Sequence, residues 1–428
     1  MIFTKIRLKN WYSFKDATLD LTYPKKIVNN TIDYEYLKKF ERINFKRVQI
    51  ISGANSSGKT SFSKTISAIR DFIALGYISK YVKEGIRSDD EKVGFEVEFI
   101  SEKIRPIKEL YNDQPKPPIT TSMEYDYFST LEVTFHNSLL DSKKSLPGTQ
   151  YSYKYFSIPI QESDSITSLR KKIEKLKEGI KLKNSICFDY DKGSLISNED
   201  DNSLENSYFP SAIGYLCSDH SHPVIDHQSK IDLTKNVLYK VLKTFDPSIL
   251  GISDSIHEDS REHKGFYVDF YNGKSIYISK EGVITDNLHL LSVGTHQAVN
   301  LAKFISCVIN FSFDEKNLSF MYFLDENMAN VQSEIEKSMI NLVIEKMSHS
   351  SQFFYTTHNY EVLEMNLPVH SFVFIRRDEE NNSTFIQAEQ KFKKNDRSIL
   401  SYVKNDVLGT LPDTHLIDDL LYDGGANQ

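Results

Sequence analysis

A glycine-rich stretch at residues 53–60 constrains this chain more than any other segment. It reads Gly-Ala-Asn-Ser-Ser-Gly-Lys-Thr and matches the phosphate-loop pattern G-x-x-x-x-G-K-[ST] at every fixed position. An apolar run at 48–51 precedes it, and apolar residues recur at helical spacing through 61–75. The segment therefore predicts a buried strand, a tight loop and a helix in succession, whereas a chance glycine- and serine-rich turn would need neither flank.

Each part of this loop has an expected task. Gly53 and Gly58 allow backbone conformations that turn N–H groups toward phosphate oxygens, and the helix N-terminus adds partial positive charge. Lys59 is expected to reach the β- and γ-phosphates of a nucleotide, and Thr60 to ligate Mg²⁺. The remaining phosphate contacts are expected from Ala54, Asn55, Ser56, Ser57 and Ser61.

Two later apolar runs end in polar side chains that suit the same chemistry. Residues 320–326 read Phe-Met-Tyr-Phe-Leu-Asp-Glu, a strand pattern closed by two carboxylates. Asp325 is expected to hold the Mg²⁺ shell and Glu326 to polarise the attacking water. Adjacent acids also mark helix starts, but downstream of a phosphate loop the catalytic interpretation is favoured. Residues 352–358 form another strand pattern ending in His358, a candidate γ-phosphate sensor, although a lone histidine at a strand end is more often structural.

A rarer phrase lies between these motifs. Residues 291–297 read Leu-Ser-Val-Gly-Thr-His-Gln and precede an amphipathic helix pattern. Ser292 and the backbone of Gly294 would then stand at a helix N-terminus, where anions bind. The alternative is an ordinary serine N-cap.

Taken in order, the phosphate loop, L-S-x-G-x-x-Q, apolar-Asp-Glu and Thr-His resemble the motif set of ATP-binding cassette (ABC) ATPases. More narrowly, they are similar to the SMC/RecF-like heads and the overcoming-lysogenization-defect (OLD) family, as are residues 6–16 and 245–249. The resemblance covers residues 1–100 and 235–377. It implies an α/β fold: an ABC-ATPase head with a mixed phosphate-loop sheet flanked by helices, an antiparallel β lobe and an inserted helical segment.

The resemblance also implies a mechanism in which two heads sandwich two ATP molecules with Mg²⁺. The residues acting within one chain would be Lys59, Thr60, Asp325, Glu326 and His358, and those acting across the interface would be Ser292 and Gly294. Because the chain holds one motif set, the hydrolysing unit is expected to be a homodimer or a higher homo-oligomer. Residues 327–332 depart from the family pattern, since they lack the proline and later acid common in transporters.

The domain organisation predicted around these motifs has four parts. They are the N-terminal part of the head (1–100), a continuation of the β lobe with a helical and loop insertion (101–234), the C-terminal part of the head (235–377), and a hairpin and helix (378–428). Alternating apolar and polar residues predict antiparallel strands at 93–100, 129–135 and 151–159. Residues 163–183 read as a short charged helix with an apolar seam, a candidate dimerisation or partner-docking surface.

Composition narrows the class of protein. Three cysteines give no disulfide framework, and no apolar run is long enough to span a bilayer. The first residues form a strand pattern instead of a secretion signal, so we expect a cytoplasmic protein without a membrane partner. A net charge of −7 gives no global attraction to nucleic acid, while basic stretches at 171–183 and 376–394 leave local DNA contact open.

One further cluster raises the question of a metal site. Cys217, His220, His222 and His227 lie close together, but their spacing matches no standard zinc pattern. A loop rich in histidine and serine explains the cluster equally well, and both interpretations stay open.

The segment after residue 377 is too short for an appended nuclease domain of the OLD type. The chain therefore resembles the stand-alone ATPase subunits of bacterial anti-phage systems of the PARIS and Septu type, which implies a separate effector protein, such as a nuclease. The leading hypothesis is an ATPase that acts as a sensor or scaffold for that effector. The alternatives are a RecF/SMC-like DNA-repair ATPase that binds DNA directly, and a scaffold that binds ATP without hydrolysing it.

Overall fold

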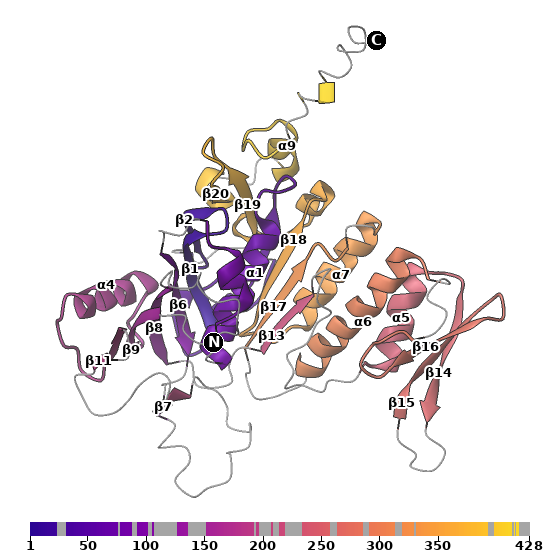
Figure 1. The fold of residues 1–428 in the computed structure, drawn as a ribbon, viewed down its shortest axis with the longest axis horizontal. Coiled ribbons are helices and arrows are strands. Elements are labelled where there is room, and N and C mark those ends of the chain that lie inside the picture. The colour runs from indigo at the N-terminus through magenta and orange to yellow at the C-terminus, as the bar shows by residue number, and fades with distance from the viewer. Residues whose placement is uncertain are drawn as a thin grey trace, which may run out of the picture.

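Two large β-sheets with a helix between them organise this mixed α/β molecule (Figure 1). The structure is a computed structural model. It describes residues 1–23, 31–75, 78–87, 92–101, 105–106, 126–135, 151–191, 194–196, 207–208, 214–218, 233–256, 263–285, 291–312, 319–328, 331–392, 398–412, 415 and 417–418. Within these ranges, no helix is long and apolar enough to cross a membrane.

The first sheet has six strands in the order β13-β17-β18-β5-β19-β20 and is parallel except for the edge strand β20. Its strands are β5 (Val48–Ser52), β13 (Gly214–Ser218), β17 (Phe320–Asp325), β18 (Gln352–Thr357), β19 (Phe372–Arg377) and β20 (Ser383–Gln387). Every residue of β5, β17 and β18 is buried, as expected for parallel strands covered on both faces. The predicted strands at 48–51, 320–325 and 352–357 are confirmed, and their carboxyl ends meet at one edge.

The second sheet has seven antiparallel strands in the order β11-β10-β9-β8-β6-β1-β2. They are β1 (Ile2–Trp11), β2 (Phe14–Asp20), β6 (Val93–Ser101), β8 (Tyr127–Phe135), β9 (Tyr151–Pro159), β10 (Ile186–Asp191) and β11 (Ser194–Ile196). The antiparallel strands predicted from alternating residues are therefore confirmed in β6, β8 and β9.

Helix α1 (Lys59–Arg70) lies between the two sheets (Figure 1). Its Phe62 is fully buried, with ring centroids 6.4 Å from Phe14 of β2 and 5.0 Å from Phe385 of β20. On the parallel sheet it meets Phe323 at 5.9 Å and Phe354 at 6.4 Å. One aromatic side chain thus ties the helix behind the phosphate loop to both sheets.

Three helices and a small antiparallel sheet lie on the other side of the parallel sheet, and the helices separate that small sheet from it (Figure 1). They are α5 (Lys235–Phe245), α6 (Val293–Ser312), α7 (Ser333–Lys346), and a three-stranded antiparallel sheet of β14 (Ile249–Ile256), β15 (His263–Phe270) and β16 (Ser275–Ser279). The amphipathic helix predicted to follow residues 291–297 is confirmed as α6, but it already begins at Val293, inside that phrase. The β14–β16 sheet is not anticipated by the sequence analysis.

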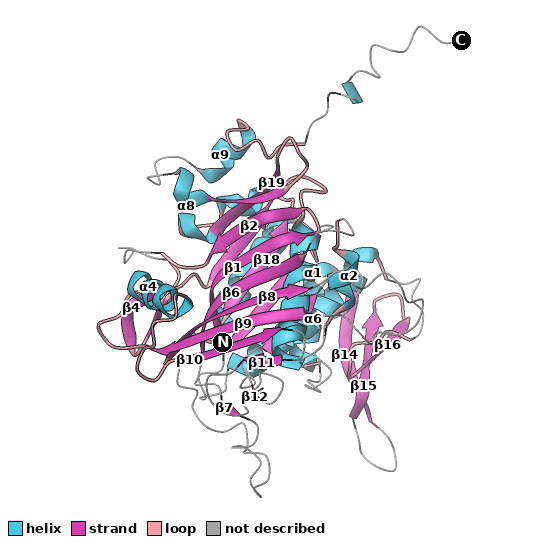
Figure 2. Cartoon of the chain, turned by 60° about the vertical axis from the view of Figure 1, so that its left-hand side comes forward, coloured by secondary structure: helices cyan, strands magenta, loops and turns pink. Residues whose placement is uncertain are grey.

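The predicted charged helix is present as α4 (Ile166–Lys177), but its apolar seam is not a free docking surface. Ile166, Leu169, Ile173 and Leu176 are all buried, because the helix packs on β8, β9 and β4 (Phe40–Asn44) of its own chain. The proposal of dimerisation through this seam is therefore wrong. In Figure 2, α4 lies at one side of the molecule and β14–β16 at the opposite side.

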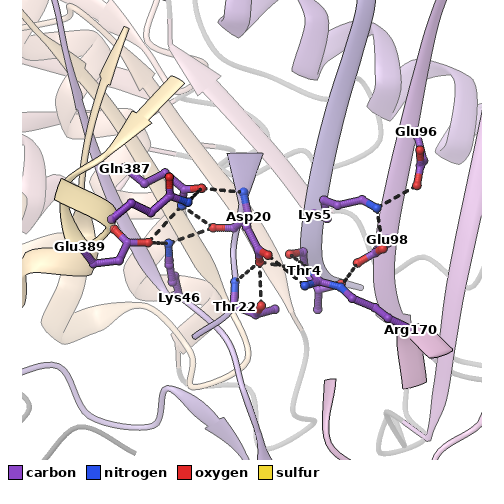
Figure 3. A network of polar contacts seen from close by, with 11 residues as sticks. Thr4, Lys5, Asp20, Thr22, Lys46, Glu96, Glu98, Arg170, Gln387 and Glu389 are labelled. Carbon is purple, nitrogen blue, oxygen red and sulfur yellow. Dashed lines mark hydrogen bonds and ion pairs between the residues drawn. The ribbon is translucent and has the colours of Figure 1, made fainter. Parts of the chain in front are cut away.

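Ion pairs fix α4 to the charged face of the antiparallel sheet (Figure 3). Arg170 lies 2.9 Å from Asp20 at the end of β2 and 2.8 Å from Glu98 of β6. Lys5 of β1 continues the network to Glu98 at 2.6 Å and Glu96 at 2.8 Å. The network therefore joins α4 and strands β1, β2 and β6.

The predicted C-terminal hairpin is present as β19–β20, although its first strand lies before residue 378, and the helix after it is α9 (Ile399–Lys404). Gln387 donates to the carbonyl of Asp20 at 2.7 Å, which joins the hairpin to β2 (Figure 3). The shorter elements are β3 (Tyr36–Leu37), β7 (Arg105–Pro106), β12 (Ser207–Tyr208), η1 (Asp71–Leu75), α2 (Lys80–Glu84), η4 (Tyr360–Glu364), η5 (Val369–Ser371) and α8 (Ala388–Lys391).

Candidate functional site

The glycine loop joins β5 to α1, as the sequence predicts. Gly58 has φ 120°, a conformation that side chains rarely adopt, and a Cβ there would lie 2.8 Å from Ser383 Oγ. A Cβ at Gly53 would lie 2.5 Å from the carbonyl oxygen of Ile375. Both glycines of the pattern are therefore required by the backbone and by close neighbours.

Lys59 lies at the end of this loop, at the first position of α1. Its side chain is only 3% exposed, and its Nζ donates to the carbonyl oxygens of Gly53 at 2.8 Å and Ala54 at 3.0 Å. The same Nζ lies 3.1 Å from Glu326 Oε1. The structure thus brings together the loop lysine and the predicted catalytic carboxylate, which are 267 positions apart in the sequence (326 − 59).

The two carboxylates follow each other at the end of β17. Asp325 is buried and accepts a hydrogen bond from Thr356 Oγ1 of the neighbouring strand β18. Glu326 is partly exposed and adopts φ 51°, while its N–H donates to Thr356 Oγ1 at 3.1 Å. The left-handed conformation turns the chain between the two residues, so that one carboxylate faces Thr356 and the other faces Lys59.

The exposed parts of the loop face solvent at the same edge. Asn55, Ser56 and Thr60 are exposed, and Ala54 and Ser61 are partly buried. Helix α1 begins at Lys59, and its N-cap, Gly58, provides no side chain to cap the first turn. The N–H groups of that turn therefore depend on a partner from outside the helix, which is the property that makes helix N-termini bind anions.

Two serines that the sequence analysis missed support the loop from behind. Ser383 Oγ of β20 donates to the carbonyl oxygen of Ser57 at 2.5 Å and lies 2.6 Å from Ser13 Oγ. The N–H of Ser383 donates to the carbonyl oxygen of Ser13 at 2.7 Å. Ser13 stands in a segment that the family resemblance includes, whereas the sequence around Ser383 gives only a hairpin pattern.

His358 is exposed directly after β18, at the edge where β17 and β5 also end. The preceding Thr357 and the following Asn359 are both held by hydrogen bonds to Glu336 of α7. The structure thus gives the predicted sensor a fixed backbone and an accessible side chain.

Ser292 and Gly294 are not joined to the glycine loop. Ser292 Oγ accepts a hydrogen bond from Thr295 N at 3.1 Å, so it acts as the N-cap of α6, as the alternative interpretation of this serine states. Ser292 is also exposed. Across the described ranges, no hydrogen bond or ion pair connects either residue with residues 53–61 of the same chain.

The residues present fit a nucleotide phosphate and Mg²⁺. The hydroxyls of Ser52 and Ser57 are buried and have no hydrogen-bond partner among the described residues, beside a loop whose glycines leave no room for side chains. Thr60 and Asp325 supply a hydroxyl and a carboxylate, the hard oxygen ligands that Mg²⁺ prefers. Thr60 follows the lysine in the first turn of α1, and Asp325 precedes Glu326, which lies 3.1 Å from that lysine.

The structure describes only one of the four residues considered as a metal cluster, Cys217. Cys217 lies in strand β13, paired in register with Phe323, and not in a loop. His220, His222 and His227 lie outside the described residues. In the part of the chain that the structure describes, no group of three or more histidine, cysteine or carboxylate side chains could hold a metal ion.

The structure therefore brings Lys59, Asp325 and Glu326 to one edge of the parallel sheet, with His358 at the end of the adjacent strand, and leaves Ser292 and Gly294 unconnected to them within the chain. Thr356, Ser13, Ser383 and Glu336 are polar residues around this edge that the sequence analysis did not single out. A search with the sequence finds no match among models of protein families and none among curated proteins.

Proposed function

We propose that this chain is an ABC-type ATPase that hydrolyses ATP to ADP and phosphate. The observation that carries the proposal is the position of Lys59 Nζ, which bridges the carbonyls of the glycine loop and the carboxylate of Glu326. A phosphate-binding lysine and a candidate general base thereby share one edge of a parallel sheet. In α/β proteins, that edge is where ligands bind.

Each residue then has a role. Gly53, Gly58 and the N–H groups of residues 54–61 cradle the phosphates, and Lys59 compensates their charge. Glu326 accepts the proton of the attacking water, and His358 donates to the γ-phosphate. Mg²⁺, held by Thr60 and Asp325, supplies charge neutralisation when bound.

The active unit in this proposal is at least a homodimer. Ser292 is exposed at the N-terminus of α6 and has no bond to the glycine loop of its own chain within the described residues. A second copy can present the N-terminus of α6, with Ser292 and Gly294, to the phosphates of the first. Dimerisation would thus complete both sites at once.

The biological role proposed is that of a sensor or scaffold that regulates a separate effector, such as a nuclease, in bacterial anti-phage defence. This part rests on the resemblance to stand-alone ATPase subunits. Part of the basic stretch considered for DNA contact is already paired, since Lys172 lies 2.7 Å from Asp164 and Lys177 lies 2.7 Å from Glu132. Direct DNA binding is therefore the weaker alternative, and it predicts salt-sensitive binding by the isolated protein.

The test compares ATP turnover and assembly in wild type and Glu326→Gln. We expect the wild type to release phosphate and the variant to lose about 100-fold or more of kcat, while it accumulates as an ATP-bound dimer in light scattering. Equal turnover in the two proteins would overturn the hydrolytic proposal, and ATP binding without turnover would favour the scaffold. A variant that stays monomeric with ATP would overturn the shared site.

A further inference from the structure

Helix α7 carries a buried carboxylate that the proposed function does not use. Glu336 is 1% exposed and accepts three hydrogen bonds from neutral donors. Its Oε1 receives the hydroxyls of Tyr355 at 2.6 Å and Thr357 at 2.9 Å, and its Oε2 receives Asn359 Nδ2 at 2.7 Å. Burial raises the pKa of Tyr355 well above its ordinary range, and the charge of Glu336 adds to the effect, so the phenol keeps its proton and donates.

The three residues that donate to Glu336 are every second residue along β18 and the segment that follows it. Side chains of a strand point to opposite faces in turn, so Tyr355 and Thr357 share the face toward α7. Thr356 takes the opposite face and donates to Asp325. His358 follows in sequence between Thr357 and Asn359, which are both bonded to Glu336.

Asn359 is fixed in one orientation by its other contacts. Its Nδ2 also reaches Ser333 Oγ at 3.0 Å in the first turn of α7, and its Oδ1 accepts from the N–H of Glu361 at 3.0 Å. The N–H of Asn359 donates to Thr357 Oγ1 at 2.9 Å. The amide cannot flip without losing the contacts of Nδ2 with Ser333 and Glu336, so hydrogen bonds hold the backbone after His358 in place.

We propose that Glu336 is a positioning residue for His358. Its carboxylate fixes the backbone on both sides of the exposed histidine and so presents the imidazole at the edge that holds Lys59 and Glu326. The residue acts through Thr357 and Asn359 and does not touch the substrate. The role in turnover rests on the proposed ATPase function, whereas the positioning itself does not.

The chemistry of the pair provides a specific test. In Glu336→Gln, the new amide presents an N–H group either to Asn359 Nδ2, which places two donors against each other, or to the hydroxyls of Tyr355 and Thr357, which then have to turn from donating to accepting. In Asn359→Asp, two carboxylates would meet instead. In the double variant Glu336→Gln/Asn359→Asp, the glutamine amide can donate to the new carboxylate, and the hydrogen-bond pairing is restored with the same net charge.

The experiment follows the His358 imidazole by NMR, with its signal assigned from its absence in His358→Asn. We expect the signal to shift or broaden in each single variant and to return toward the wild-type position in the double variant. Glu334→Gln is the matched control, because Glu334 is an exposed acid in the same turn of α7. This control is expected to leave the signal unchanged.

Turnover gives the second readout. Each single variant is expected to lose about 10- to 100-fold in kcat, the cost of displacing a catalytic group by roughly 1 Å, with little change in ATP affinity. The loss should be small when Glu336→Gln is introduced into His358→Ala, because the positioned group is already missing. If Glu336 had a purely structural role, the free-energy costs of Glu336→Gln and His358→Ala on kcat would be additive.

An unchanged His358 signal in Glu336→Gln would overturn the inference, as would a double variant no closer to wild type than the single variants. These outcomes are distinct from failure of the proposed function. If the wild type did not hydrolyse ATP, the ATPase proposal would fall, while the NMR comparison would still decide whether Glu336 positions His358.

Discussion

The two large sheets use charge in opposite ways. The antiparallel sheet carries its charges along one face, where Arg170, Lys5, Asp20 and Glu98 pair with one another and hold α4 in place (Figure 3). The parallel sheet is covered on both faces, so strands β17 and β18 carry apolar and aromatic residues along their middle. The polar residues that end these two strands, Asp325 and Thr357, lie at the carboxyl edge.

The two regions also differ in how their charged groups are paired. In the network on the face of the antiparallel sheet, every cation has a carboxylate partner, and this pairing shifts the pKa values of Asp20 and Glu96. Burial alone would raise the pKa of Asp20, but the hydrogen bonds and charge of Arg170 outweigh it and lower that pKa below its ordinary value. At the edge, Glu336 is bonded to neutral donors, and Lys59 is shared between carbonyls and one partly exposed carboxylate. We infer that changes on the face affect stability, and that changes at the edge affect chemistry.

The largest expected effect is at the edge. Lys59→Met removes the cation that compensates the phosphates, so we expect kcat/KM for ATP to fall by about 100- to 1000-fold. The melting temperature should stay close to that of the wild type, because the lysine contributes no apolar core packing. A large loss of stability with this substitution would contradict the inference that changes at the edge affect chemistry and changes on the face affect stability.

The second effect tests the loop backbone. Gly58→Ala places a Cβ at a φ of 120° and 2.8 Å from Ser383 Oγ, so the loop has to shift. We expect ATP binding to be lost and stability to fall by about 1–3 kcal/mol. The matched control is Gly179→Ala, which also has a positive φ of 86° but has no atom within 4 Å of the new Cβ. The control should keep full ATP binding in calorimetric titration.

The third effect belongs to the face network. Arg170→Met keeps the length of the side chain but removes its bonds to Asp20 and Glu98, while Lys5 still pairs with Glu98. We expect a loss of about 1–3 kcal/mol in the free energy of unfolding, measured with urea, and unchanged kcat at saturating ATP. Loss of turnover without loss of stability would contradict the comparison.

The smallest effect is on the pH dependence of stability. The pKa of Asp20 is lowered in the folded protein, so its contribution is fully present above its ordinary value of 3.8 and is lost as the pH falls through the lower folded value. The same sign holds for Glu96, whose pKa is lowered by Lys5 against the opposing effect of burial. Wild-type stability should therefore decline in this acid range, and Arg170→Met should show a shallower decline. Parallel profiles for the two proteins would exclude Asp20 as a contributor.

Local patterns were sufficient to predict the centre of the site. The strand, loop and helix around residues 48–70, the strand ending at Asp325 and the strand ending before His358 are all confirmed. Each is a short contiguous segment whose pattern reflects its own burial. The order of the motifs did not reveal which strands are neighbours or which residues lie within hydrogen-bond distance.

Other features depended on contacts between distant segments. The seam of α4 has the spacing of an interface helix, but it is buried on its own sheet because that sheet offers an apolar and charge-complementary surface. Strand β13 was not predicted, because its short run, 214–218, becomes a strand by pairing with β17. The sheet β14–β16 exposes several apolar and aromatic side chains, among them Leu250, Ile256 and Tyr267, so its strands do not alternate cleanly between apolar and polar residues.

The sequence by itself determined which residue types stand at the edge: a glycine loop with Lys59 and Thr60, two adjacent carboxylates and a histidine after a strand. Those assignments rest on residue type and local conformation. Only the tertiary structure decided that Lys59 faces Glu326, that Ser13 and Ser383 support the loop, and that Glu336 holds the backbone around His358. These contacts join residues up to 370 positions apart, and they are fixed by how the two sheets and their helices pack, which no local pattern encodes.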